Sequence, residues 1–205
     1  MVAEFKNIEI AYDDKIVIRD LSFDIEPGQK VAITGASGTG KSTILNVLAG
    51  FTPYTKGTLN VLGKTLNAEN IQWIRQQLAW VPQETALHFD TVREIIDAPF
   101  EFASNQELKP NASQIQELFD VLNLPIDILD KTPATISGGQ RQRVLLASSL
   151  FLQKPILITD EPTSALDESN RKQITDYVLG QKDLTVIAST HDAYWMEQSD
   201  KVIAL

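Results

Sequence analysis

Gly35-Ala-Ser-Gly-Thr-Gly-Lys41-Ser42 is the stretch that decides the fold of this 205-residue chain. It follows an apolar run at Val31–Ile33 that is typical of a buried strand, and it leads into a helical pattern at Thr43–Ala49. This order of strand, glycine loop and helix is the context in which the pattern G-x-x-x-x-G-K-S binds phosphate. The sequence therefore predicts a nucleoside triphosphate site.

The residue types of this loop suit a phosphate ligand. Its glycines can adopt backbone angles closed to other residues, so successive N–H groups turn inward around phosphate oxygens. Lys41 supplies a positive charge for the β- and γ-phosphates, the hydroxyl of Ser42 suits Mg²⁺, and the helix N-terminus adds N–H donors. We expect nucleotide contacts from Gly35, Ala36, Ser37, Gly38, Thr39, Gly40, Lys41, Ser42 and Thr43.

The composition narrows the class of protein without naming a function. A formal net charge of −9 argues against nucleic acid as a partner, because binding to a phosphate backbone requires a basic face. The absence of cysteine excludes disulfides and thiolate metal sites. No apolar run approaches the roughly 18–20 residues that span a bilayer, and the N-terminus does not resemble a signal peptide. We therefore expect a cytoplasmic protein that reaches the membrane only through a partner.

Strand and helix patterns alternate along the chain after a β-rich start. Alternating apolar residues at 8–12 and 21–25 predict antiparallel strands with one buried face. Later apolar runs predict strands at 58–62, 78–81, 156–158 and 185–189, the last two as central strands of a parallel sheet. The expected fold class is α/β.

Residues 84–137 follow a different pattern, with helical signals at 92–102 and 113–122. We therefore expect a single domain over residues 1–205. Residues 1–83 and 138–205 would form the three-layer core with an antiparallel β subdomain, and 84–137 an all-helical insert.

A second anion-binding pattern lies at Ile136-Ser-Gly-Gly-Gln-Arg-Gln-Arg143. Ser137 and the two glycines after it open an expected helix whose apolar face is Val144, Ala147 and Phe151. A hydroxyl, glycine N–H groups and a helix N-terminus together suit an anion. A plain serine N-cap explains the same residues, so the pattern alone leaves both interpretations open. One triphosphate lying between two such helix ends would give this chain a use for the second.

Four further positions carry residue types suited to triphosphate hydrolysis. Asp160 follows a buried strand, so its carboxylate can reach a Mg²⁺ ion held by Ser42. Glu161 can polarise the attacking water, although an Asp-Glu pair elsewhere would be a solvated charge pair. Gln83 offers an uncharged acceptor for Mg²⁺ or water, although a loop glutamine needs no such role. His191 should reach the same sheet edge and contact the γ-phosphate, although a lone histidine there is more often structural.

Together these elements resemble the ATPase subunit of ABC transporters, in family order across nearly the whole chain. The resemblance covers Walker A at 35–42, the Q-loop at Val81–Gln83, the signature at Ile136–Gln140, Walker B at Ile156–Pro162, the D-loop at Ser164–Asp167 and the switch histidine at Thr190–Asp192. Ile136 stands where leucine is usual, and Thr159 where an apolar residue is commoner. Tyr12 resembles the aromatic residue that stacks on adenine, although it also suits an apolar strand position.

The resemblance implies a P-loop NTPase core of the ABC ATPase type that binds ATP and Mg²⁺. It implies catalytic roles for Lys41, Glu161 and His191, and Mg²⁺ ligation through Ser42, Gln83 and Asp160. The signature residues Ser137, Gly138, Gly139 and Gln140, with Asp167 of the D-loop, would serve a second copy of the chain in a head-to-tail dimer.

The resemblance also implies a membrane-spanning partner subunit. That partner would dock against the helical insert and hold the protein at the inner face of the cell membrane. The sequence points to a groove between Gln83 and the helix at 92–102, with Phe89, Ile95 and Phe100 among its apolar contacts.

Within the family, short stretches are similar to the FetA/YbbL group of ATPase subunits of putative bacterial iron exporters. These stretches are Arg75–Gln77, Asp90–Val92, Ser164–Asn170 and Asp200–Ile203. Two other functions remain open from the sequence: a non-transport ABC ATPase in metal-cluster assembly or envelope mechanics, and a P-loop kinase of small metabolites. The signature at Ser137–Gln140 argues against the kinase.

Overall fold

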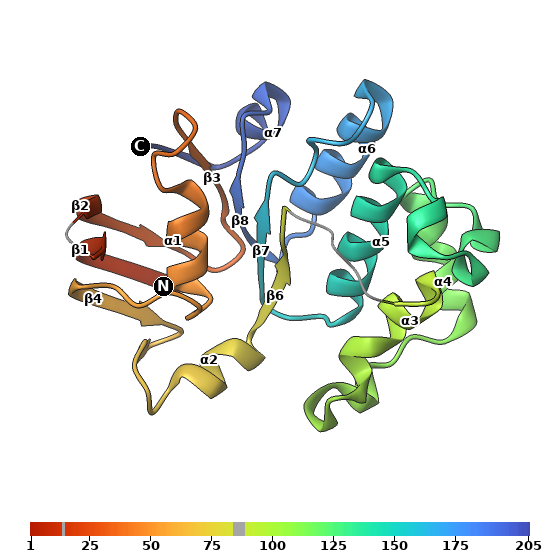
Figure 1. The fold of residues 1–205 in the computed structure, drawn as a ribbon, viewed down its shortest axis with the longest axis horizontal. Helices are drawn as coiled ribbons and strands as arrows, with labels where there is room; N and C mark the ends of the chain where they lie inside the picture. The colour runs from red at the N-terminus through yellow and green to blue at the C-terminus, as the bar shows by residue number, and fades with distance from the viewer. Residues whose placement is uncertain (14, 84–88) are drawn as a thin grey trace.

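A five-stranded parallel sheet runs through the middle of the molecule in the order β6-β7-β8-β3-β9 (Figure 1). A computed structural model describes residues 1–13, 15–83 and 89–205. The strands are β3 (Lys30–Thr34), β6 (Leu78–Val81), β7 (Ile156–Asp160), β8 (Thr185–Ser189) and β9 (Lys201–Ala204). Because all strands point the same way, their carboxyl ends meet at one edge of the sheet, where ligands of open α/β sheets bind.

The two faces of this sheet belong to two different apolar cores, because successive side chains of a strand point to opposite faces. Ile156 and Ile158 of β7 pack in the core that contains α1 (Lys41–Leu48) and α2 (Ile71–Gln76). Leu157 lies in the other core. That core includes α5 (Gly138–Phe151), α6 (Glu168–Leu179) and α7 (Ala193–Glu197). Helix, sheet and helix thus form the expected three layers.

An antiparallel sheet covers α1 on the side away from the parallel sheet (Figure 1). Its order is β2-β1-β4-β5, from β1 (Ala3–Tyr12), β2 (Lys15–Ile25), β4 (Lys56–Val61) and β5 (Lys64–Thr65). Phe5 of β1 is buried and stacks on Phe23 of β2, with ring centroids 4.3 Å apart. Tyr12 of β1 and Val17 of β2 line the same cavity as Lys41, so this sheet also forms one side of the site.

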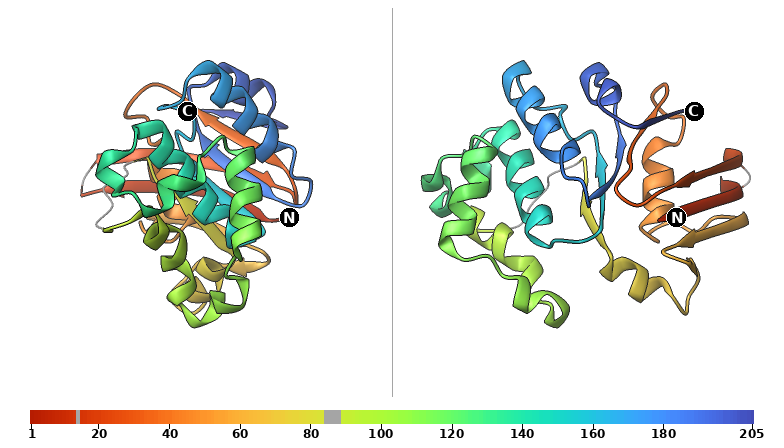
Figure 2. Two further views of the ribbon diagram at one scale, coloured as in Figure 1. Left: turned by 90° about the vertical axis from the view of Figure 1, so that its right-hand side faces the viewer. Right: turned by 180° about the vertical axis from the view of Figure 1, so that it is seen from behind.

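The chain between β6 and α5 forms helices, which lie at the end of the molecule opposite the antiparallel sheet (Figure 2). They are α3 (Val92–Asp97), η1 (Ala98–Glu101), η2 (Ala103–Leu108), α4 (Ala112–Val121), η3 (Ile126–Asp130) and η4 (Pro133–Thr135). Their apolar side chains share one core with α5 and a face of the parallel sheet. The described part of the insert is therefore packed onto the sheet layer and shares its core.

The helix expected over 92–102 is shorter than the sequence pattern suggests. The α-helix ends at Asp97, and a 3₁₀ turn with Pro99 in its first positions follows. Proline has no N–H to donate and its ring clashes with the preceding helical turn, so the regular helix stops there. Phe102 then takes an extended conformation, with φ −74° and ψ 129°. No helix of the described ranges is both long and apolar enough to cross a membrane.

Candidate active site

The phosphate loop connects β3 to α1 with a backbone that only glycine adopts easily. Gly38 and Gly40 have φ of 81° and 101°, and Gly40 is the N-cap of α1. Among the described residues no side chain caps this helix, so its first N–H groups face the loop without a side-chain acceptor from that part of the chain. A Cβ on Gly40 would lie 2.8 Å from the side chain of Ile18, so the loop also packs closely against β2.

Lys41 is held over the loop by the loop's own carbonyl groups. Its ammonium donates to the oxygens of Gly35 at 2.9 Å and Ala36 at 3.1 Å. The hydroxyl of Thr39 also donates to the oxygen of Ala36, at 2.9 Å. These three residues therefore shape the loop and orient the lysine.

A cavity of about 640 Å³ gathers most of the expected site residues. It is lined by Tyr12, Val17, Ser37, Gly38, Gly40, Lys41, Ser42, Thr43, Gln83, Asp160, Glu161, Ser164 and His191. Gly35, Ala36 and Thr39 are not among the lining residues; Gly35 and Ala36 hold Lys41, and Thr39 holds Ala36. Tyr12, at the end of β1, is 47% exposed, so it is no core residue of the strand.

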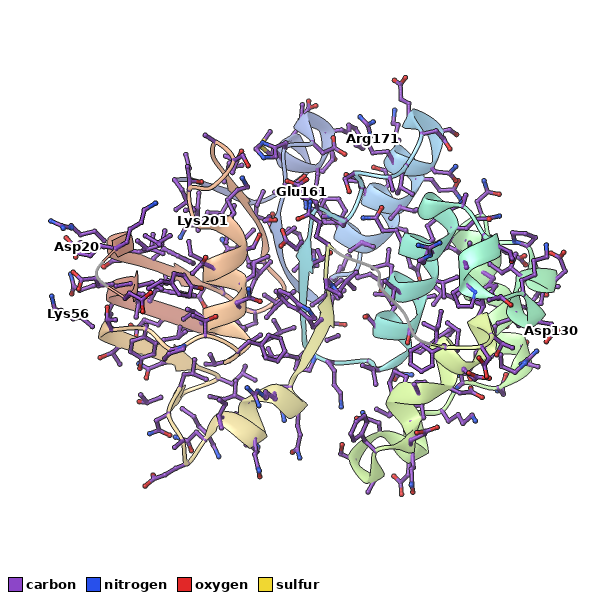
Figure 3. All side chains as sticks on the ribbon, viewed as in Figure 1. Asp20, Lys56, Asp130, Glu161, Arg171 and Lys201 are labelled. Atoms are coloured by element: carbon purple, nitrogen blue, oxygen red, sulfur yellow. The ribbon has the colours of Figure 1, made fainter. Side chains whose placement is uncertain are left out.

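The two carboxylates after β7 have different surroundings. Asp160 is only 6% exposed, and its carboxylate accepts a hydrogen bond from the hydroxyl of Ser189 on the neighbouring strand. Glu161 lies at the upper end of β7 in Figure 3, and its φ of 49° turns the chain away from the sheet. Burial raises the pKa of Glu161, against the opposing effect of the His191 N–H group and imidazole. A carboxyl with a raised pKa accepts a proton more readily, as a general base requires.

His191 faces Glu161 across the carboxyl edge of the sheet. Its Nε2 lies 3.6 Å from one carboxylate oxygen of Glu161, and its backbone N–H donates to the other oxygen at 3.4 Å. The imidazole is exposed on its other side, toward the cavity. The structure thus brings together the phosphate loop, the acidic pair and the histidine from three strands of one sheet.

The signature residues lie outside this cavity. Ser137 is the N-cap of α5, and its hydroxyl accepts from the N–H of Gln140 at 3.1 Å, while the Gln140 side chain accepts from the N–H of Ser137 at 3.0 Å. The serine N-cap is therefore real. Gly138 and Gly139 differ. A Cβ on Gly139 would lie 2.8 Å from the oxygen of Ala165, whereas the nearest described atom to a Cβ on Gly138 would be Ala165 Cβ, at 4.0 Å.

Asp167 also lies outside the cavity and is the N-cap of α6. Its carboxylate accepts from the backbone N–H of Asn170 at 3.0 Å and from the Asn170 side-chain amide. These two hydrogen bonds lower the pKa of Asp167. The side chain is exposed, so this ionised carboxylate can meet another molecule.

Three residues to which the sequence assigned no role of their own support the site. Gln142 is 5% exposed and donates to the backbone oxygen of Glu161 at 2.6 Å. Asp192 caps α7 and accepts from the hydroxyl of Thr163 at 2.8 Å. Val17 lines the cavity beside Tyr12. Gln142 lies within the quoted signature pattern, but the pattern does not reveal which way its side chain points.

A phosphate loop, an acidic pair after a central strand and a facing histidine, on this three-layer fold, define the class as P-loop nucleoside triphosphatases. The family model described as ABC transporter matches residues 18–164. The chain belongs to this family, as one of its ATP-binding, ATP-hydrolysing subunits.

Named relatives and solved structures agree with this family. The chain is 33% identical to the energy-coupling factor transporter ATP-binding protein EcfA1 of Mycoplasma pneumoniae, over 99% of this chain and 75% of that protein. It is 31% identical to the probable iron export ATP-binding protein FetA of Escherichia coli, over 98% of this chain and 90% of that protein. An ATP-binding cassette solved as a dimer in a post-hydrolysis state with ADP and Pi superposes with a TM-score of 0.86 and 26% identity, covering 99% of this chain and 94% of that one.

Proposed function

We propose that the cavity at the carboxyl edge of the sheet hydrolyses ATP to drive a separate membrane subunit. The observation that carries this proposal is the convergence of Lys41, Ser42, Asp160, Glu161 and His191 on one cavity. Phosphoryl transfer needs charge stabilisation and positioning more than covalent chemistry. Lys41 and the loop N–H groups would supply the charge stabilisation around the β- and γ-phosphates.

In this proposal Glu161 accepts the proton of the attacking water. Its raised pKa and its position one residue beyond Asp160 support that role. His191 would orient the γ-phosphate and, through its contact with Glu161, hold the carboxylate in place. Tyr12 would stack on the adenine ring at the exposed end of the cavity.

The donors of the site suit Mg²⁺ bound together with the nucleotide. Ser42, Gln83 and Asp160 all line the cavity and offer oxygen atoms. Mg²⁺ is bound by one or two carboxylates together with substrate phosphates. The described residues include no group of three or more His, Cys, Asp or Glu side chains that could hold a metal alone, which fits that mode. Bound there, the ion would neutralise charge on the β- and γ-phosphates.

The site is proposed to be completed by a second copy of the chain. Ser137, Gly138, Gly139 and Gln140 lie outside the cavity of their own chain, and so does Asp167. A Cβ on Gly138 would touch only Ala165 Cβ, at 4.0 Å, among the described residues, so this chain does not crowd Gly138 against a phosphate from another chain. The dimeric cassette that superposes on this chain supports a pair of copies.

The proposed docking site for the membrane subunit is an apolar groove of about 360 Å³ between β6, α3 and α5. Its walls include Trp80, Phe89, Ile95 and Phe102. Phe100, which the sequence suggested as a contact, is only 4% exposed and lines an adjacent hollow with Glu94, Asp97 and Glu101. The exposed apolar contact is Phe102, at 68% exposure, because the turn at Pro99 directs it outward. Docking there would place the chain at the inner face of the membrane.

The cargo that we propose to test first is iron, and the proposed direction of transport is export. The relative named for iron export is matched over 90% of its length, and short stretches of this chain resemble that group. Cargo contacts would lie in the membrane subunit, so cellular iron content, measured with and without both subunits, tests this part.

The hydrolysis proposal is tested by Glu161→Gln. We expect this variant to bind ATP and Mg²⁺ normally, to hydrolyse ATP at least about a hundredfold more slowly, and to accumulate as an ATP-bound dimer, because only the proton acceptor is lost. Phosphate release measures the rate, and size-exclusion chromatography with ATP measures the dimer. Wild-type turnover in this variant would remove Glu161 from its assigned role.

A further inference from the structure

Glu161 owes its position to a contact from α5 that the proposed hydrolytic chemistry does not use. Its φ of 49° lies in a region that non-glycine residues occupy only when their surroundings hold them there. The Glu161 N–H donates to the oxygen of Ser189 at 3.0 Å, and its own oxygen accepts from Gln142 Nε2 at 2.6 Å and from the Ser164 hydroxyl at 3.1 Å. Of these three partners, Gln142 is the one that belongs to a helix, α5.

Gln142 makes a second hydrogen bond that fixes the loop after Glu161. Its Oε1 accepts from the N–H of Ala165 at 3.3 Å. The Gln142 side chain is nearly buried, so neither bond is readily replaced by water. One amide therefore joins the backbone of the proposed base and the backbone of the D-loop to α5.

The first turn of α5 also touches the same loop directly. A Cβ on Gly139 would lie 2.8 Å from the oxygen of Ala165, so helix and loop are in close contact at this point. A movement of the start of α5 would therefore be transmitted to residues 161–165.

We propose that Gln142 is a positioning residue that couples the two ATP sites of the dimer. It attaches the Glu161 backbone, which serves one site, to the helix that begins at Ser137 and serves the other. This inference rests on the proposed head-to-tail arrangement. When the start of α5 binds the nucleotide held by the partner chain, Gln142 then shifts Glu161 of its own chain into position.

The test compares Gln142→Leu with Gln173→Leu. The control residue makes a similar bond, from Nε2 to the oxygen of Val121 at 2.7 Å, but lies on the exposed side of α6 away from the cavity. We expect Gln142→Leu to lower kcat about ten- to a hundredfold, with KM changed less than about twofold and the Hill coefficient for ATP reduced toward 1. Gln173→Leu should keep wild-type kcat and Hill coefficient. Equal kcat and Hill coefficients in the two variants would overturn the proposal.

Gln142→Met guards against loss of folding in the leucine variant. It keeps the side-chain length and buries no charge, but it cannot donate to the oxygen of Glu161. We expect the same fall in kcat at a temperature where the variant is fully folded. A fall in melting temperature with unchanged kcat per folded molecule would show that the contact is merely structural.

Mixed dimers separate this inference from the proposed function. Each pairs one chain carrying Glu161→Gln, which still binds ATP, with one chain whose Glu161 is intact, so both sites hold nucleotide and one can hydrolyse it. Gln142→Leu should slow hydrolysis when it lies in the chain that supplies Glu161, and much less when it lies in the Glu161→Gln chain. An effect only from the Glu161→Gln chain would overturn the positioning role. Wild-type turnover in the dimer with Glu161→Gln in both chains would instead count against the proposed function.

Discussion

The starts of α1 and α5 resemble each other in sequence but differ in structure. The N-cap of α1 is Gly40, with φ 101° and no side-chain cap, and the loop before it lines the cavity. The N-cap of α5 is Ser137, which exchanges hydrogen bonds with Gln140 and lies outside the cavity. The first helix start is open to a ligand within its own chain, whereas the second caps the N–H group of Gln140 with its own serine. Two anion-type helix ends in one chain therefore serve different molecules in the proposed dimer.

The sharpest test of this difference is a change at Gly138. Gly138→Asp should reduce hydrolysis at least about tenfold while ATP binding by the monomer and the melting temperature stay near wild type, because the new carboxylate repels phosphate only in the dimer. Phosphate release, nucleotide titration and thermal melting measure the three quantities. Mixing with a Lys41→Ala chain should restore one working site per dimer.

A substitution at Gly139 should affect the melting temperature, which Gly138→Asp should not. Gly139→Ala should lower the melting temperature, because its Cβ would collide with the backbone oxygen of Ala165 in the same chain. If the Gly138→Asp mixture stays inactive although mixed dimers form, the two helix starts do not meet across an interface.

Tyr12 tests whether the α1 site holds the nucleotide base within one chain. Tyr12→Ala should weaken ATP binding by about 1–3 kcal/mol, the usual scale of base stacking on an aromatic residue, and Tyr12→Phe should not. Fluorescent-nucleotide titration of the monomer measures the affinity, and GTP should compete because stacking tolerates any purine. Equal affinities of the Ala variant and the wild type would return Tyr12 to a role in the strand.

The other end of α5 tests whether that helix also serves the membrane subunit. Leu145 and Leu152 line the groove next to Phe102, so Phe102→Lys should abolish co-purification with the membrane subunit and its stimulation of hydrolysis. Hydrolysis by the isolated dimer should persist. Ile126→Lys, at another exposed apolar position, is the matched control. Cross-links that place the membrane subunit only on the antiparallel sheet would contradict this docking site.

The smallest expected effect is on the melting temperature, through the charge of Glu161 in the cavity beside α1. Because burial raises its pKa, the folded protein favours the protonated form, and the stability this gives at low pH is lost as pH rises through the raised pKa. Glu161→Gln should therefore melt above the wild type at pH 7 and at nearly the same temperature at pH 4. Melting curves across this range measure the difference. A gap that does not change with pH would show that charge burial is not its cause.

Local chemistry in the sequence was sufficient to predict the phosphate loop, the helix start at Ser137 and the strands that carry Asp160 and His191. Such features depend on neighbouring residues: glycines at a tight turn, a cap at a helix start, an apolar run in a buried strand. The parallel sheet then brings the ends of its strands together. The sequence therefore determined the fold class and the family, and the residues of the site remain predictions that the cavity supports.

Only the tertiary structure decided which side chains face which neighbour. Phe100 and Phe102 are both aromatic and two residues apart, yet the turn at Pro99 buries one and exposes the other. Gly138 and Gly139 are adjacent and identical, yet only the second lies against the D-loop. Gln142 reaches Glu161 because α5 packs beside the end of β7. These contacts join residues distant in the chain, so the relative orientation of packed elements determines them, and local sequence does not encode that orientation.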